Sequence, residues 1–200
     1  MKKYLALGDS YTIGESVPMN ENFPHQLVSR LNENGNVVSP PEIIATTGWT
    51  TDELIKAIEE KNPSHDFDLV TLLIGVNNQY RGYDIGIYKK EFEQLLHIAI
   101  KCANGNKHHV IVVSIPDYGV TAFAAAMDKE KIHSELDQYN LISKQICEKE
   151  GVDYVDITAG SRKASDDTSL IAGDGLHPSG KMYEQWVEAM LPKVVEIIKN

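Results

Sequence analysis

Short apolar runs alternate along the chain with longer segments in which apolar residues recur every three or four positions. The short runs are rich in β-branched and aliphatic residues and lack strict apolar–polar alternation, which is typical of strands buried on both faces. The expected strands are residues 3–7, 42–46, 69–74, 109–115 and 152–155. Strands separated in this way by helical segments predict βαβ units and a parallel sheet.

The longer segments predict amphipathic helices over residues 23–34, 51–60, 88–103 and 129–150, and a final helix that begins near Pro178. Pro192 is expected to kink or break that last helix. Crossovers between parallel strands are right-handed, so helices must cover both faces of the sheet. We therefore expect an α/β protein, a single domain over residues 1–200, with a three-layer α/β/α sandwich of about five parallel strands.

Charge and composition restrict the partners of such a domain. The formal net charge is −10 and the basic residues form no cluster, so nucleic acids and anionic membranes would repel the chain. No apolar stretch approaches the roughly 20 residues of a membrane-spanning helix, and the apolar run behind Lys2 and Lys3 is too short for a signal peptide. A cytoplasmic protein is expected, and the sequence does not specify its oligomeric state.

The cysteines and histidines do not have the spacing of a metal site. Cys102 and Cys147 stand apart, each inside an expected helix, which is typical of core thiols. His108 and His109 are neighbours at a strand start, so their side chains point to opposite faces of the sheet. The remaining histidines show no ligand spacing. We expect no metal and no cofactor.

A serine and a histidine far apart in the sequence have the partners that nucleophilic catalysis requires. Ser10 follows the first expected strand and a glycine turn, which puts it at the carboxyl edge of the sheet, where α/β proteins bind their ligands. A serine nucleophile needs a base for its proton and a group that orients the base. His177 can act as the base and Asp174 as the orienting group. The two residues are three positions apart, so both lie on the same side of a helical turn.

Two other strand ends offer hydrogen-bond donors for an oxyanion. Gly48 follows the second expected strand, where a glycine allows close approach to its backbone N–H. Asn77 follows the third strand and carries a side-chain amide. Each residue alone is ordinary turn chemistry. Their occurrence with Ser10 and His177, at the edge where a parallel sheet collects its loops, points to acyl transfer.

The substrate pocket is harder to predict. Aromatic side chains more often pack than bind, but we expect it to draw on residues near the proposed edge, namely Trp49, Asn78, Tyr80 and Tyr118. The apolar loop over residues 116–128 follows the fourth strand and is equally suited to filling space or to forming a substrate wall.

Taken together, four blocks resemble the SGNH hydrolases, also called GDSL-type esterases and lipases: Gly8-Asp9-Ser10, Gly48, Gly75-x-Asn77 and Asp174-x-x-His177. The resemblance implies a flavodoxin-like sandwich, the architecture already expected from the pattern. It implies that Ser10 is the nucleophile, with His177 as base and Asp174 orienting it. It also implies an oxyanion hole made by the N–H groups of Ser10 and Gly48 and by the Asn77 side chain.

The chain departs from this family pattern at two positions. Tyr11 stands where the family name has leucine, and Asn78 stands where an aspartate often follows the block asparagine. Neither position belongs to the proton relay or the oxyanion hole. The departures therefore bear on subfamily and substrate more than on chemistry.

The expected function is a serine esterase that hydrolyses carboxylic esters with short acyl or acetyl groups through an acyl-enzyme. Acetylated sugars, simple esters, lysophospholipids and thioesters all remain open as substrates. The alternative is a catalytically inactive flavodoxin-like protein that binds a small molecule or a carbohydrate. A phosphate-binding loop is disfavoured because Glu15 follows Gly14 where a lysine would be needed. Another hydrolase superfamily is disfavoured because the chain has no Gly-x-Ser-x-Gly elbow.

Overall fold

A computed structural model describes residues 1–199 of the chain. Its sheet contains five parallel strands in the order β2-β1-β3-β4-β5. The strands are β1 (Tyr4–Gly8), β2 (Glu42–Ala45), β3 (Leu69–Leu73), β4 (Val110–Val113) and β5 (Asp153–Val155). The five expected strands are therefore confirmed, and the parallel sheet with them.

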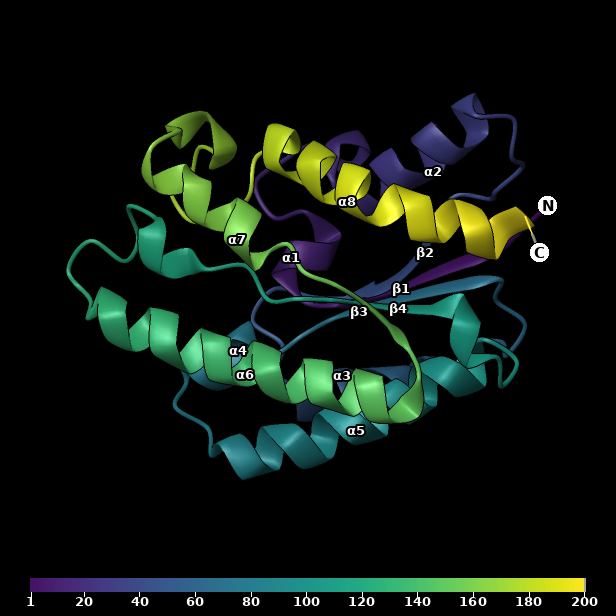
Figure 1. The fold of residues 1–200 in the computed structure, drawn as a ribbon, viewed down its shortest axis with the longest axis horizontal. Coiled ribbons are helices and arrows are strands. Elements are labelled where there is room, and N and C mark those ends of the chain that lie inside the picture. The colour runs from purple at the N-terminus through teal and green to yellow at the C-terminus, as the bar shows by residue number, and fades with distance from the viewer. Residues whose placement is uncertain (200) are drawn as a thin grey trace.

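Helices cover both faces of this sheet, so the three-layer sandwich is confirmed (Figure 1). On one face lie α2 (Phe23–Glu33) and α8 (Gly180–Lys199), and on the other lie α3 (Thr51–Lys61), α5 (Ile85–Cys102) and α6 (Lys129–Glu150). The central strands β1 and β3 are buried along their whole length, because each is covered by helices on both sides.

The last helix begins near Pro178 as expected, at Gly180, but it continues through Pro192 to Lys199 without a break. The expected break is therefore wrong. Beyond the proline, Val194, Ile197 and Ile198 are buried, and this packing outweighs the hydrogen bond that the proline cannot donate.

Several short helices were not expected from the sequence. They are α1 (Ser10–Ile13), α4 (Val76–Tyr80) and α7 (Thr158–Ser161), with 3₁₀ turns at Met19–Glu21, Lys107–His109, Tyr118–Val120, Arg162–Ser165 and Thr168–Leu170. Each of the three α-helices is one turn or little more, which is too short to show an apolar period. They follow β1, β3 and β5, at the carboxyl edge of the sheet.

Cys102 and Cys147 are buried free thiols, as expected. Among residues 1–199, no helix combines the length and the apolar character needed to cross a bilayer.

Candidate active site

The turn after β1 presents Ser10 at the edge of the sheet. Gly8 is required there, because a Cβ at this position would lie 2.1 Å from Thr12 Oγ1 and 2.5 Å from the Leu73 carbonyl oxygen. Asp9 then caps α1, since its Oδ1 accepts a hydrogen bond of 3.0 Å from the N–H of Tyr11. Ser10 is consequently the first residue of the helix.

Asp174 and His177 form a closed pair at the other end of the chain. His177 Nδ1 lies 2.6 Å from Asp174 Oδ2, and Asp174 Oδ1 accepts from the N–H groups of Leu176 and His177, each at 3.0 Å. This carboxylate turn, and not the expected helical turn, brings the two side chains together, because α8 begins only at Gly180. The bond at Nδ1 leaves Nε2 of the ring free to face the cavity.

Ser16 is a partner of Asp174 that the sequence did not reveal. Its hydroxyl donates to Asp174 Oδ2 over 2.8 Å, and its backbone adopts the left-handed region, with φ of 66°. Partial burial acts to raise the pKa of Asp174, but the hydrogen bonds from His177, Leu176 and Ser16 outweigh it and hold that pKa well below the usual 3.8. Asp174 is therefore a carboxylate at any pH near neutrality.

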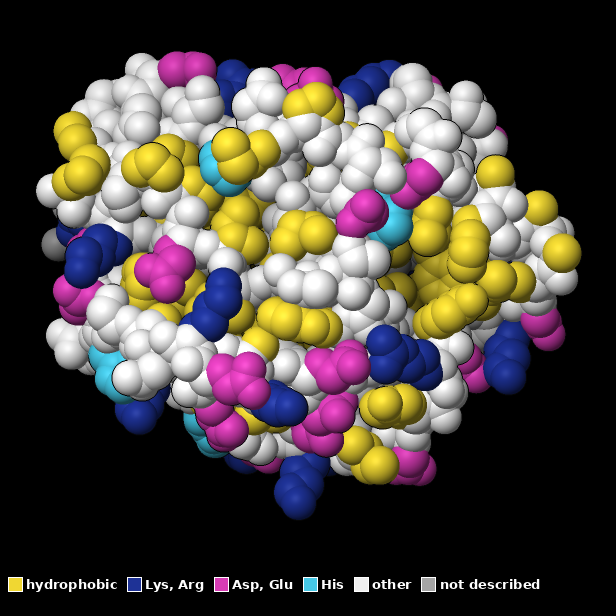
Figure 2. Space-filling model, turned by 180° about the vertical axis from the view of Figure 1, so that it is seen from behind, with side chains coloured by type: hydrophobic (Ala, Val, Ile, Leu, Met, Phe, Trp, Pro, Cys, Tyr) yellow, Lys and Arg dark blue, Asp and Glu magenta, His cyan; other side chains and the backbone are white. Residues whose placement is uncertain are grey.

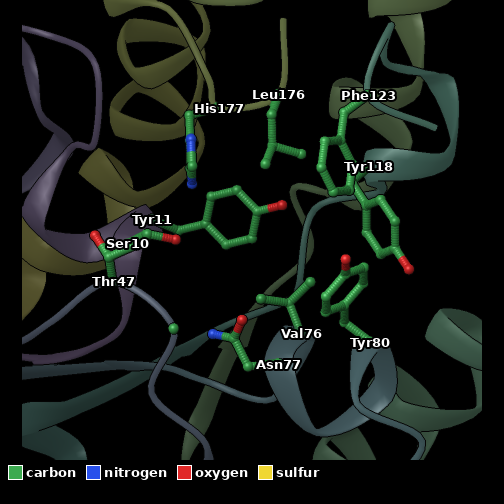
Figure 3. Close-up of a pocket in the computed structure, with 11 residues that line it drawn as sticks. Ser10, Tyr11, Thr47, Val76, Asn77, Tyr80, Tyr118, Phe123, Leu176 and His177 are labelled. Atoms are coloured by element: carbon green, nitrogen blue, oxygen red, sulfur yellow. The ribbon is translucent and has the colours of Figure 1, made fainter. Parts of the chain in front are cut away.

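The ring of His177 points into the cavity toward Ser10 (Figure 3). Its orientation is supported on one side by the ring of Tyr11, which meets it edge-on with centroids 5.8 Å apart. A hydrogen bond between Ser10 Oγ and His177 Nε2 is not formed in the structure. Such catalytic bonds are often long until the substrate is bound.

Three hydrogen-bond donors surround the same space. The N–H of Ser10, at the first position of α1, has no partner within the helix, and the N–H of Gly48 donates to no acceptor among residues 1–199. Gly48 is in a left-handed conformation with φ of 87°, which few other residues adopt. Asn77 Nδ2 uses one hydrogen on the carbonyl of Trp49, at 2.9 Å, and keeps a second hydrogen available.

A second set of contacts holds the Gly48 turn in place. Arg81 donates from its guanidinium to the Gly48 carbonyl over 2.5 Å and lies 3.4 Å from Glu53. On the other side, Thr47 donates its hydroxyl to Glu15. Neither interaction was expected from the sequence, because all four partners are charged or polar residues of ordinary surface type. Arg81 and Glu15 thus position a backbone N–H without contacting the cavity's reactive groups.

One cavity of about 130 Å³ joins these groups. One end of it is lined by Ser10, Asn77 and His177, and the other by Val76, Tyr80, Tyr118, Phe123 and Leu176 (Figure 3). Gly48 also lines it. Figure 2 shows hydrophobic side chains gathered around a hollow on the side of the molecule where the strands have their carboxyl ends. The loop over residues 116–128 is therefore a wall of the cavity, through Tyr118 and Phe123.

A second Asp–His pair fixes that loop. Asp117 Oδ2 lies 2.6 Å from His133 Nδ1 and 2.8 Å from Arg162 Nε, and Asp117 Oδ1 accepts from the N–H of Gly119 at 2.8 Å. Its carboxylate is buried. The pair has the distance of the Asp174–His177 pair, but neither member lines the cavity that contains Ser10. We assign it to the anchoring of the loop.

Comparison with known proteins shows the family of the chain. The model of the GDSL-like lipase/acylhydrolase family matches residues 6–185. The chain belongs to the GDSL-like lipase/acylhydrolase family. Ser10, Gly48, Asn77, Asp174 and His177 all lie within the matched residues of this GDSL-like chain.

Individual relatives are more distant. An arylesterase of Vibrio mimicus is 27% identical over 120 residues, which cover 59% of this chain and 58% of that protein. Among solved structures, a member of the lipolytic G-D-S-L family from Veillonella parvula superposes with a TM-score of 0.74 at 17% identity, over 96% of this chain and 97% of its own. The acetylxylan esterase Axe2 of Geobacillus stearothermophilus gives 0.67 at 21% identity, over 96% and 94%. These structures show the shared fold.

The predicted pocket residues of this GDSL-like protein fall into two groups. Tyr80 and Tyr118 line the cavity, whereas Trp49 and Asn78 do not. Asn78 is fully buried and bonds Thr51 through both ends of its amide, at 3.1 and 2.7 Å. Trp49 packs against the core and contributes only its carbonyl, to Asn77. The prediction is wrong for both, because the Asn78 amide binds Thr51 in the interior and the Trp49 ring packs against the core.

The buried carboxyl of Asp9 makes the free energy of unfolding depend on pH. Its side chain is fully buried, and burial raises its pKa from 3.8 to about 7. Between these values the carboxyl ionises in the unfolded chain but stays protonated in the folded one, so its ionisation favours unfolding as pH rises and the effect levels off above pH 7.

We therefore expect Asp9→Asn to gain stability relative to the natural chain between pH 4 and pH 8. The gain should reach up to ~4 kcal/mol, since one pKa unit corresponds to about 1.4 kcal/mol. Urea unfolding of both proteins at a series of pH values measures the difference. A difference that stays constant across this range would contradict the buried, protonated carboxyl.

Proposed function

We propose that the protein is a serine esterase that hydrolyses carboxylic esters with short acyl groups through an acyl-enzyme intermediate. Ser10 is the nucleophile, His177 the general base and Asp174 the residue that orients it. The N–H groups of Ser10 and Gly48 and the Asn77 amide form the oxyanion hole. The observation that carries the proposal is the single cavity that Ser10, His177, Gly48 and Asn77 line together.

The first half of the reaction forms the acyl-enzyme. Ser10 Oγ attacks the ester carbonyl while His177 Nε2 takes its proton. Asp174 accepts the hydrogen bond from Nδ1, which selects the tautomer with a free Nε2 and stabilises the imidazolium that forms. The ring then returns the proton to the oxygen of the leaving alcohol as the carbon–oxygen bond breaks. A water molecule repeats the sequence on the acyl-enzyme and releases the acid.

The negative charge on the former carbonyl oxygen develops between Ser10, Gly48 and Asn77. Backbone N–H groups fixed by α1 and by the Gly48 turn do not have to reorganise during the reaction, which is the source of their catalytic effect. The Arg81 and Glu15 contacts hold the Gly48 turn in this position.

The cavity supports the assignment to short acyl groups. Its volume of about 130 Å³ is close to the ~150 Å³ of an apolar protein cavity that binds benzene. The cavity opens to solvent on one side, so its volume limits only the part of a substrate that it encloses, and acetyl, propionyl and butyryl groups fit within it.

We expect Asn77→Ala to lower kcat by about 10²–10³-fold with a much smaller change in KM. The amide acts on the oxyanion, which exists only after attack, so its loss falls on the transition state. Initial rates with p-nitrophenyl acetate measure both constants. Because Asn77 also bonds the Trp49 carbonyl, a thermal melt of the variant serves as the control. A change confined to KM would contradict the role.

A panel of substrates tests the function as a whole. Wild type is assayed on p-nitrophenyl esters of two to twelve acyl carbons, on acetylated xylose and on a thioester, with Ser10→Ala as the blank. We expect turnover of the short oxygen esters, declining beyond about four carbons. Binding without turnover of any ester would favour the alternative, a non-catalytic small-molecule or carbohydrate-binding protein.

A further inference from the structure

The residue that follows the nucleophile carries a polar atom that the proposed mechanism does not use. The Tyr11 side chain is only 3% exposed and lies in the wall of the cavity. Its ring packs edge-on against His177 on one side and against Trp186 on another, with centroids 5.8 and 6.3 Å apart. These contacts fix the ring. Its hydroxyl end points away from Ser10 and toward the apolar half of the cavity (Figure 3).

The Tyr11 hydroxyl has no hydrogen-bond partner among the described residues. The hydroxyls of Tyr88 and Tyr183 are also buried without a partner among residues 1–199, but neither residue lines the cavity. The Tyr4 hydroxyl lies 2.9 Å from Thr71 Oγ1, and the Tyr118 hydroxyl donates to Gln79 at 2.9 Å. The Tyr11 hydroxyl faces the cavity, so an acceptor that binds there can replace water and form a direct hydrogen bond with it. The Tyr11 hydroxyl in the cavity wall is therefore available to donate a hydrogen bond to an acceptor atom of a ligand.

The surroundings of this hydroxyl are almost entirely apolar. The far half of the cavity is formed by Val76, Leu176 and three aromatic rings, those of Tyr80, Tyr118 and Phe123, whose centroids lie 5.9–6.3 Å apart. The Tyr118 hydroxyl is occupied by Gln79, which Glu135 holds in turn at 2.8 Å. The Tyr80 hydroxyl also has no partner among the described residues, but Tyr80 is half exposed. Tyr11 is thus the buried residue whose hydroxyl can donate within this apolar compartment.

We propose that the Tyr11 hydroxyl is a specificity-determining donor that binds a single hydrogen-bond acceptor on an otherwise apolar substrate. The substrate class is a short ester whose acyl or alcohol group carries one ether, keto or hydroxyl oxygen a few bonds from the scissile carbonyl. This inference rests on the proposed esterase function. A polyhydroxylated sugar ring does not suit the compartment, because its remaining hydroxyls would find no partners there.

The inference also accounts for the departure from the GDSL pattern. Leucine in the family name offers no hydrogen bond, whereas tyrosine at position 11 places one in the cavity. Burial and the nearby Asp9 carboxyl raise the pKa of Tyr11 well above 10, so the hydroxyl stays a neutral donor wherever the enzyme works. A site built around a polar contact discriminates more strongly than one built on shape alone.

Pairs of esters that differ only by oxygen in place of carbon test the contact. On the acyl side, the pairs are p-nitrophenyl methoxyacetate against butyrate, and 4-oxopentanoate against 4-methylpentanoate. On the alcohol side, the pair is 4-methoxyphenyl acetate against 4-ethylphenyl acetate. The quantity compared is the ratio of kcat/KM within each pair, for wild type and for Tyr11→Phe. Intrinsic reactivity cancels when the ratio for the variant is divided by that for wild type.

We expect Tyr11→Phe to lower this ratio about tenfold for the pairs on one side of the ester, either acyl or alcohol. A tenfold change is about the effect of one neutral hydrogen bond. The side on which it occurs identifies the part of the substrate that carries the acceptor. Tyr11→Leu should lower it similarly, which provides a second variant if the first is unstable. Tyr154→Phe is the matched control, since the Tyr154 hydroxyl bonds Asn140 and lies outside the cavity lining.

The outcomes separate this inference from the function on which it rests. Ratios within twofold of wild type in all arms, with Ser10-dependent turnover intact, would overturn the role of Tyr11 and leave the esterase assignment standing. Turnover that is absent, or that persists in Ser10→Ala, would overturn both.

Discussion

Ser10→Ala should lower kcat for p-nitrophenyl acetate by at least about 10³-fold, and by up to about 10⁶-fold by analogy with other serine hydrolases. Alanine keeps the backbone N–H of position 10 but removes the only atom that can bond covalently to the acyl carbon. What remains is the activity that the oxyanion hole and binding supply without a nucleophile, about 10³–10⁴-fold over water. KM should change little, because Ser10 is small and lies at the end of the cavity.

The control for this result is a serine remote from the cavity. Ser29 is exposed on α2, where its hydroxyl bonds Glu33, so Ser29→Ala should retain full activity. Initial rates of the purified proteins, with folding checked by circular dichroism, provide the comparison. A Ser10→Ala enzyme within tenfold of wild type would show that another group performs the attack.

His177→Ala should cost nearly as much, again about 10³–10⁶-fold in kcat, because a serine hydroxyl without a base is a poor nucleophile. The two residues act as one unit. We therefore expect the double variant Ser10→Ala/His177→Ala to be no slower than the worse single variant, since non-additivity of this kind marks residues that share a step.

Two outcomes decide that expectation. Effects that multiply in the double variant would mean that Ser10 and His177 act independently, contrary to the proton transfer between them. The control here is His97→Ala: His97 is exposed on α5 and contacts Glu150 far from the cavity. It should leave kcat within twofold of wild type.

The long elements of the fold were predictable because each has a distinct pattern. The apolar runs of β1 and β3 are buried on both faces, and α6 spans residues 129–150 as predicted, with Asp128 as its cap in the structure and Gly151 after its last residue. The α1, α4 and α7 helices could not be predicted, because one turn contains too few residues for a period and depends on its neighbours. Likewise, Pro192 did not end α8, since buried residues beyond it keep the helix packed.

The candidate site shows a similar division. Residues with a chemical requirement could be singled out from the sequence, and the structure brings Ser10, Gly48, Asn77 and His177 to one cavity. Residues that act through geometry could not be found in this way. Ser16 reaches Asp174 across 158 positions of the chain, which no local pattern records.

The pocket prediction failed for a related physical reason. Trp49 and Asn78 each directly follow a site residue, Gly48 and Asn77, but adjacent residues on a turn point in different directions. Asn78 therefore faces Thr51 in the interior, while Asn77 faces the cavity. The sequence left the loop over residues 116–128 open between filling space and forming a wall, because its position depends on the Asp117 anchor, which is itself made by residues distant in sequence.

Covalent labelling tests the central claim most directly. A fluorophosphonate probe reacts only with a serine made nucleophilic by its surroundings, and peptide mass spectrometry locates the adduct. The account predicts one adduct, on the peptide containing Ser10, that forms at the rate at which esterase activity is lost and is absent from His177→Ala. Labelling of a different serine, or loss of activity without any adduct at Ser10, would contradict it.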